Sequence, residues 1–82
     1  MTDEMKYRLV LHTIEKYNLN PFDNLTALDV AKDLKIGKNK VYQLFNDKDF
    51  PSVEIGKTKV VMVLSYYLWK LEKQCKLEGK GN

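Results

Sequence analysis

Four side chains that can form hydrogen bonds or ion pairs stand close together between positions 38 and 43. They are Lys38, Asn39, Lys40 and Gln43, and the apolar residues Val41, Leu44 and Phe45 stand among and after them. Asn and Gln can pair with the edge of adenine, and Lys can reach guanine acceptors or phosphates. These residue types therefore indicate nucleic-acid recognition, provided that a helix turns them outward.

The segment around these residues has the pattern of two short helices that meet at positions 35–37. Thr26 and Asp29 have the spacing of a capping box, so the first helix is predicted to start there. Its inner face is predicted to carry Leu28, Ala31 and Leu34. The second helix is predicted to begin at Gly37 or Lys38 and to end near Asp47. A helix-turn-helix needs small and apolar residues at five inner positions, which are supplied in order by Ala31, Leu34, Ile36, Val41 and Leu44. A plain helical hairpin with a lysine-rich surface is the alternative.

A short hairpin is predicted directly after the helix pair. Residues 52–55 alternate in polarity, positions 56–58 carry a turn signal, and residues 59–62 read as a second strand. A lone two-stranded hairpin is marginal in water, so it must pack against the helices. In this position it would form a wing, and its Lys57, Thr58 and Lys59 are expected over phosphates or an adjacent minor groove. Lys48, in the preceding connection, belongs to the same predicted basic surface.

Amphipathic helices are predicted at both ends of the chain, over residues 3–18 and 63–77. They are expected to pack on each other through two apolar stripes, Tyr7, Val10, Leu11, Ile14 and Tyr17 on the first and Leu64, Tyr67, Leu68, Leu71 and Cys75 on the second. The second helix carries a further stripe of Val63, Tyr66 and Trp69. Two interpretations of this stripe stay open: one enlarged core that buries everything, or an exposed protein interface for a homodimer or another partner.

Composition bounds the function. The 82 residues carry a net charge of +3, with −2 in residues 1–34, +3 in residues 35–60 and +2 in residues 61–82. A positive charge gathered on one part of a domain is expected of a surface that meets phosphate. With one Cys and one His, the chain lacks metal-ligand spacing and a nucleophile–base pair, so we expect no enzyme, metal or cofactor. No apolar run approaches the roughly 18 residues that span a bilayer and no signal peptide is evident, so a cytoplasmic protein without membrane contact is expected.

Residues 25–70 resemble the excisionase-type, MerR-like winged helix-turn-helix family. The resemblance is carried by Leu25-Thr26, Asp29-Val30-Ala31, Leu34, Ile36, Val41-Tyr42, Leu44, Asp49-Phe50-Pro51, Val53, Ile55-Gly56 and Trp69. The family usually has Gly in the turn where this chain has Lys35, so a differently shaped turn is expected. Its wing is commonly rich in Arg, whereas Arg8 is the only arginine of this chain.

The resemblance implies a winged helix-turn-helix with a two-stranded wing and a C-terminal helix. The helix predicted over residues 3–18 has no counterpart in the family and adds an extra N-terminal helix, so the expected fold is α+β and mostly helical. It forms one domain over residues 1–78, with the helix extension at 1–21, the helix-turn-helix and wing at 25–62, and a frayed tail at 79–82. The implied function is sequence-preferring binding of double-stranded DNA, as an excisionase of a phage or mobile element that acts with an integrase and assembles cooperatively on DNA. A small dimeric transcriptional regulator and a phage DNA-packaging or scaffold adaptor are the alternatives.

Overall fold

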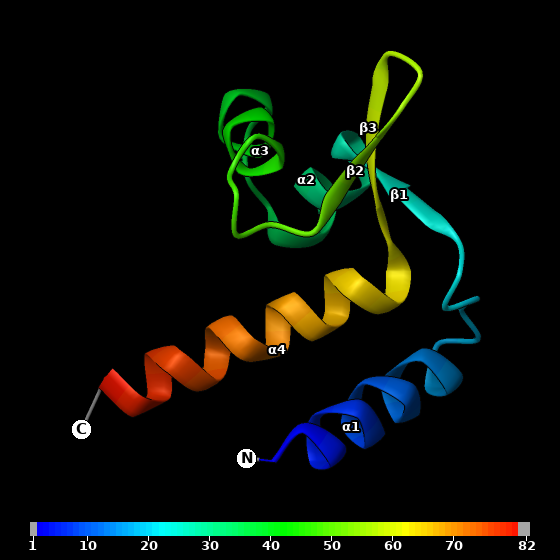
Figure 1. The fold of residues 1–82 in the computed structure, drawn as a ribbon, viewed down its shortest axis with the longest axis vertical. Coiled ribbons are helices and arrows are strands. Elements are labelled where there is room, and N and C mark those ends of the chain that lie inside the picture. The colour runs from blue at the N-terminus through cyan, green and yellow to red at the C-terminus, as the bar shows by residue number, and fades with distance from the viewer. Residues whose placement is uncertain (1, 81–82) are drawn as a thin grey trace.

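The computed structural model describes the backbone of residues 2–80 and the side chains of residues 2–74. The fold is α+β and mostly helical, and Figure 1 shows α4 lying between α1 and the remaining elements. The elements in chain order are α1 (Asp3–Lys16), β1 (Asn24–Thr26), α2 (Ala27–Leu34), α3 (Lys38–Phe45), β2 (Ser52–Ile55), β3 (Thr58–Met62) and α4 (Val63–Lys80).

The sheet has three antiparallel strands in the order β1-β3-β2. The predicted hairpin is confirmed, because Val53 pairs with Val60 and Ile55 with Thr58 across β2 and β3. Strand β1 was not predicted, since its three residues are too few to alternate visibly. Leu25 of β1 pairs with Val61 of β3, so the marginal hairpin gains a third strand on its inner side.

Local hydrogen bonds explain where the first two helices begin and end. Thr2 caps α1 by accepting a bond from the Met5 N–H, and the helix stops at Lys16, two residues before the predicted end. The stop is formed by Asn18 at φ 56°, a left-handed conformation that Asn tolerates well. The capping box of α2 is confirmed: Asp29 N–H donates to Thr26 Oγ1 at 3.3 Å, and Thr26 N–H donates to Asp29 Oδ2 at 3.0 Å.

The larger core cluster joins the helix pair, the sheet and α4. Its buried residues are Val30, Val41, Phe45, Phe50, Val61 and Tyr66. All five inner positions predicted for the helix pair belong to it, with Val41 buried and the other four half-buried around it. The prediction for Leu28 is wrong, because this side chain is exposed. Helix α2 instead buries the face that carries Val30. Leu28 is two positions before Val30, which on a helix points its side chain nearly the opposite way, toward solvent.

A second cluster joins α1 to α4, which run in opposite directions along each other (Figure 1). Val10, Ile14 and Val63 are buried there, and four residues of the predicted α4 stripe pack around them: Leu64, Tyr67, Leu68 and Leu71. The fifth, Cys75, has its side chain outside the described residues. On α1 the predicted stripe is too wide, because Tyr7, Leu11 and Tyr17 are exposed. Because α1 packs mainly against α4 alone, only a narrow strip of its surface is buried, and the residues beside that strip stay exposed.

The further stripe of α4 is buried, so the interpretation as an exposed interface is wrong. Val63 and Tyr66 are buried, and Trp69 is half-buried with its ring centre 4.9 Å from that of Phe50. The reason is the position of α4 between two clusters, one on each side (Figure 1). The large apolar surface of α4 therefore packs against both core clusters, one on each side of the helix.

Helix α4 continues to Lys80, beyond the predicted end at residue 77. Residues 79 and 80, predicted as part of a frayed tail, are helical, and residues 81–82 lie outside the described part. Among the described residues, no helix is long and apolar enough to cross a membrane. Within the same part of the chain, no three His, Cys, Asp or Glu side chains are grouped as metal ligands would be.

Candidate nucleic-acid interface

Helices α2 and α3 are joined by the three residues Lys35, Ile36 and Gly37. Lys35 and Ile36 both donate their N–H groups to the carbonyl of Ala31, which satisfies the end of α2. Gly37 is the N-cap of α3 and makes no side-chain cap bond. Because Ile36 packs on the larger core cluster, the turn holds α3 at a fixed position relative to α2.

Lys35, in the turn between the two helices, has an unusual backbone conformation. Lys35 has φ 57° and ψ 46°, the left-handed conformation that glycine adopts at a helix end. A residue with a Cβ atom is disfavoured there by about 1–2 kcal/mol. The turn therefore holds a lysine in a conformation that glycine would adopt without strain.

Lys35→Gly is accordingly expected to raise the free energy of unfolding by about 0.5–1 kcal/mol, because glycine adopts the left-handed conformation without strain. Urea unfolding followed by circular dichroism measures the change. Lys35→Ala is the matched control, since it removes the same charge but keeps the Cβ atom, and its stability should stay close to that of the wild type. A gain of equal size in both variants would assign the effect to charge instead of backbone strain.

Helix α3 divides its side chains between the core and solvent. Val41 and Phe45 are buried, whereas all polar residues of the helix are exposed. Asn39 and Gln43 are four positions apart, so they lie one above the other on the face turned away from Val41. Lys38 and Lys40 are exposed on the flanks of the same first turn. The arrangement predicted for these four residues, facing outward from a helix, is confirmed.

The hairpin carries the second group of candidate residues. Lys57, Thr58 and Lys59 are exposed at and beside its tip. Gly56 has φ 63°, a conformation that the tight turn requires and that favours glycine. The tip projects at the same end of the molecule as α3, away from α1 (Figure 1). The fold thus brings together two groups of candidate residues that are about 15 positions apart in the sequence.

One hydrogen bond ties these two groups to each other. Lys59 Nζ donates to the side-chain oxygen of Asn46, the residue that ends α3. The Asn46 amide nitrogen in turn donates to the Tyr42 carbonyl at 3.0 Å. Sequence reasoning missed Asn46 and the exposed Tyr42 as members of this surface. The available signal was their spacing, since Asn46 follows Asn39 by seven positions and Gln43 by three, which keeps it on the same side of the helix.

The candidate lysines differ in their electrostatic surroundings. Among the described residues, the side chains of Lys38, Lys40 and Lys57 form no hydrogen bond or ion pair within the protein. Lys59 faces Glu54 across the hairpin as well as binding Asn46. Lys48 is exposed in a loop between Asp47 and Asp49, so its charge is offset locally. Of the candidate lysines for which no ion pair or hydrogen bond is found within the described part of the chain, all except Lys48 therefore lie on α3 or at the hairpin tip.

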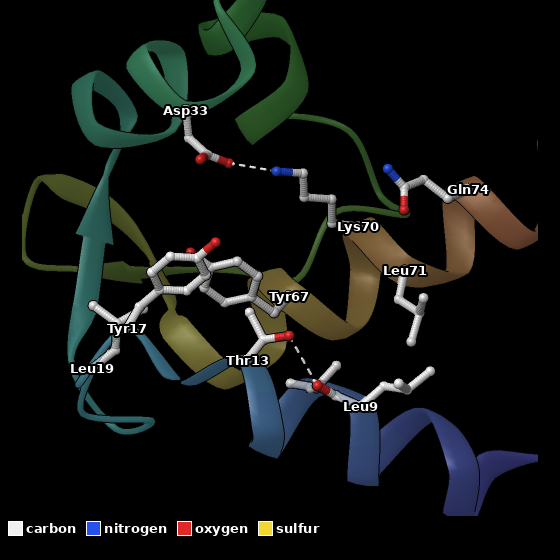
Figure 2. A pocket seen from close by; sticks show the side chains of 10 residues that line it. Leu9, Thr13, Tyr17, Leu19, Asp33, Tyr67, Lys70, Leu71 and Gln74 are labelled. Carbon is white, nitrogen blue, oxygen red and sulfur yellow. Dashed lines mark hydrogen bonds and ion pairs between the residues drawn. The ribbon is translucent and has the colours of Figure 1, made fainter. Parts of the chain in front are cut away.

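A polar network behind the helix pair anchors α2 to α4. Asp33 Oδ2 accepts bonds from the Tyr66 hydroxyl at 2.5 Å and from Lys70 Nζ at 2.9 Å, and Figure 2 shows the Asp33–Lys70 pair. Partial burial disfavours the charge of Asp33, but these two donors outweigh it and hold the pKa of this carboxyl below its ordinary value. Burial, then the bond to Asp33, raise the pKa of Tyr66 well above its ordinary value.

This network gives the stability of the protein a defined dependence on pH. Because the pKa of Asp33 is lower in the folded chain, the unfolded chain binds its proton more readily. The stabilisation is thus present above the unfolded pKa of about 3.9 and is lost as the pH falls below it. Urea unfolding at several pH values should therefore give Asp33→Asn a shallower loss of stability between about pH 5 and pH 3 than the wild type. Identical slopes would mean that Asp33 does not contribute.

Comparisons with protein-family models, with curated proteins and with solved structures found no match to this chain.

Proposed function

We propose that the protein binds double-stranded DNA without catalysis, as a winged helix-turn-helix module. Helix α3 enters the major groove, and the β2–β3 hairpin acts as the wing on the sugar–phosphate backbone. The observation that carries the proposal is the outward face of α3, where Asn39 and Gln43 stand beside the unpaired Lys38 and Lys40. The hairpin lysines lie at the same end of the molecule (Figure 1).

The dimensions and residue types support this division of roles. An α-helix with its side chains is about 10–12 Å in diameter and the major groove is about 12 Å wide, so a helix such as α3 fits into the groove. Asn39 and Gln43 have the amide groups that read adenine, whereas an ammonium group on a flexible stem suits phosphate. Lys57 and Lys59 therefore contribute affinity with little sequence preference, and discrimination between sites comes from α3.

The salt dependence of binding tests the proposal. If about five lysines neutralise phosphates, log K should fall against log salt with a slope on the order of −4 to −5. Fluorescence anisotropy of a labelled random-sequence duplex, measured at several salt concentrations, gives this slope directly. A slope near zero, or no binding at low salt, would remove the DNA-binding proposal.

The biological role that we propose is that of an excisionase of a phage or mobile element, working with an integrase. Its support is the resemblance over residues 25–70, together with a fold that has a three-stranded sheet and a basic hairpin directly after α3. Footprinting on selected sites separates this role from that of a small dimeric regulator. Direct repeats are expected for the excisionase, and an inverted repeat would favour the regulator. An adaptor that uses the fold for protein contacts would bind no specific site.

A further inference from the structure

The side chain of Asn46 lies between the end of α3 and the hairpin. Its oxygen accepts a hydrogen bond from Lys59 Nζ of β3, and its nitrogen donates to the Tyr42 carbonyl at 3.0 Å. An ammonium group can only donate and a carbonyl can only accept, so these two partners fix the orientation of the Asn46 amide.

By its position alone, Asn46 would be a third base-reading residue of α3. It follows Asn39 by seven positions and Gln43 by three, so the three amides lie on one side of the helix. To pair with adenine, an amide must offer its oxygen and its nitrogen to one base edge at the same time. In Asn46 these two atoms are held by partners on two different elements. The Asn46 amide is therefore engaged within the protein and is not presented to a base.

The sheet turns the side chain of Lys59 toward α3. Lys59 is two positions before Val61, so both side chains point to the same face of β3. Val61 is buried in the larger core cluster together with residues of α3, so this is the face on which α3 packs. Lys59 also stands opposite Glu54 in the register, but no ion pair joins them in the described part of the chain. Its ammonium group binds Asn46 instead.

Lys59 also offsets the negative end of α3. The C-terminal end of a helix carries about half a unit of negative charge, which disfavours a phosphate beside it. The last turn of α3 has no basic residue, and Lys59 supplies a positive charge there from the hairpin. A lysine ammonium group has three N–H donors, of which the bonds found among the described residues use one. The others can bind an anion at this end of the helix.

We propose that Asn46 is a positioning residue, which holds the Lys59 ammonium group at the end of α3 as a binding site for a phosphate. The ligand is a phosphate of the DNA strand that borders the groove entered by α3, and Asn46 itself reads no base. This inference rests on the proposed DNA binding. It adds that α3 and the hairpin bind DNA as one surface that is formed before DNA arrives, because Lys59 is already ordered.

Asn46→Ala is expected to weaken binding to a selected site and to random-sequence duplex alike, by about three- to tenfold. In this variant Lys59 must become ordered when DNA binds, and ordering a flexible side chain at an interface lowers affinity by about this factor. The salt slope should stay that of the wild type, because Asn46→Ala removes no charge, whereas Lys59→Ala should make the slope shallower by about 1. Anisotropy titrations of both duplexes at several salt concentrations measure these quantities.

A double variant shows whether Asn46 acts through Lys59. In a chain that already carries Lys59→Ala, Asn46→Ala should change the affinity by less than about 1.5-fold, because its partner is gone. In a chain that carries Lys57→Ala, the full loss should remain. Asn39→Ala is the matched comparison on the same side of α3, and it should weaken binding to the selected site only, with or without Lys59.

The order of Lys59 is measured in the free protein. In ¹H–¹⁵N spectra of the lysine ammonium groups, Lys59 Nζ should have a higher order parameter than Lys57 Nζ, and Asn46→Ala should remove the difference. Asn46 is exposed, so the unfolding midpoint of Asn46→Ala should stay close to that of the wild type.

Three results would overturn the positioning role of Asn46 while leaving DNA binding intact. The first is a wild type that binds DNA with the expected salt slope and an Asn46→Ala variant of equal affinity. The second is a loss confined to the selected site, which would make Asn46 a base reader. The third is a loss that persists in the Lys59→Ala chain. No binding by the wild type at low salt would instead remove the DNA-binding proposal, and this inference with it.

Discussion

Gln43→Ala is expected to weaken binding to a selected DNA site by about 10- to 100-fold while changing the affinity for random-sequence DNA by less than about twofold. The reason is geometric: Gln43 lies above Asn39 on the outward face of α3, where its amide can form two hydrogen bonds with one adenine. A good bidentate contact of this kind contributes about 1–3 kcal/mol of discrimination against other bases. Sites selected from a random duplex library and then titrated by anisotropy provide both affinities.

Two further variants show whether the effect belongs to this position. Lys40→Ala should also weaken specific binding more than non-specific binding, because Lys40 can bind a guanine acceptor at a selected site but contacts only a phosphate on random-sequence DNA. Lys57→Ala at the hairpin tip should weaken both alike, because a phosphate contact carries no sequence information. Gln74→Ala, which removes the same amide from an exposed position of α4, should change neither affinity. Equal losses on selected and random DNA for Gln43→Ala would mean that α3 does not read bases.

Phe50→Ala is expected to lower the free energy of unfolding by about 3–5 kcal/mol. Phe50 is buried and its ring centre lies 4.9 Å from those of both Phe45 and Trp69. Removing it leaves a cavity where the loop after α3 meets α4, and a domain of this size has a small total stability. Urea unfolding followed by far-ultraviolet circular dichroism gives the value, and substantial unfolding at 37 °C is an expected consequence.

The control is Phe22→Ala, which removes the same atoms from a side chain that is 73% exposed. Its stability should stay within about 0.5 kcal/mol of the wild type, as is usual for surface substitutions. Phe50→Leu, which keeps most of the buried volume, should lie between the two. If Phe50→Ala and Phe22→Ala had the same small effect, the loop after α3 would not belong to the core.

The elements whose formation is local could be predicted from the sequence. The capping box of Thr26 and Asp29, the strand pairing of residues 52–55 and the turn glycine at position 56 each depend on neighbouring residues, and each formed as expected. The alternation of residues 52–55 did not place its apolar side chains in the core, because Val53 and Ile55 are both exposed. The exposed positions of Asn39 and Gln43 follow from the burial of Val41 by helical spacing alone.

What could not be predicted depends on contacts between distant segments. Strand β1 exists because Leu25 pairs with Val61 of β3. This pairing depends on the tertiary fold and cannot be predicted from the three residues of β1 alone. Val63, Tyr66 and Trp69 were compatible with an interface or with a core, and only the position of α4 between two clusters decided it. The exposure of Tyr7, Leu11 and Tyr17 has the same origin, because it depends on which other elements pack against α1 in the folded chain.

Two features of the candidate interface also needed three-dimensional information. Lys35 adopts a left-handed conformation, which the residue type does not predict, at the end of α2 where the turn to α3 begins. The bond from Lys59 to Asn46 joins residues 13 positions apart and links the hairpin to α3. Neither residue type signals this role by itself.

The most direct test of DNA binding by α3 and the hairpin compares two triple variants of identical net charge. One carries Lys38→Ala, Lys40→Ala and Lys57→Ala on the proposed DNA face. The other carries Lys6→Ala, Lys16→Ala and Lys73→Ala on α1 and α4, away from the hairpin tip (Figure 1). Anisotropy titrations of random-sequence duplex are made at two salt concentrations for both variants and the wild type.

The first variant should lose at least about 30-fold in affinity at low salt and reduce the salt slope by about 3, because three phosphate contacts are removed. The second should keep the slope of the wild type and lose affinity only slightly through its lower net charge. Equal losses in the two variants would contradict the assignment of DNA to this face and would leave only non-specific attraction to a basic protein.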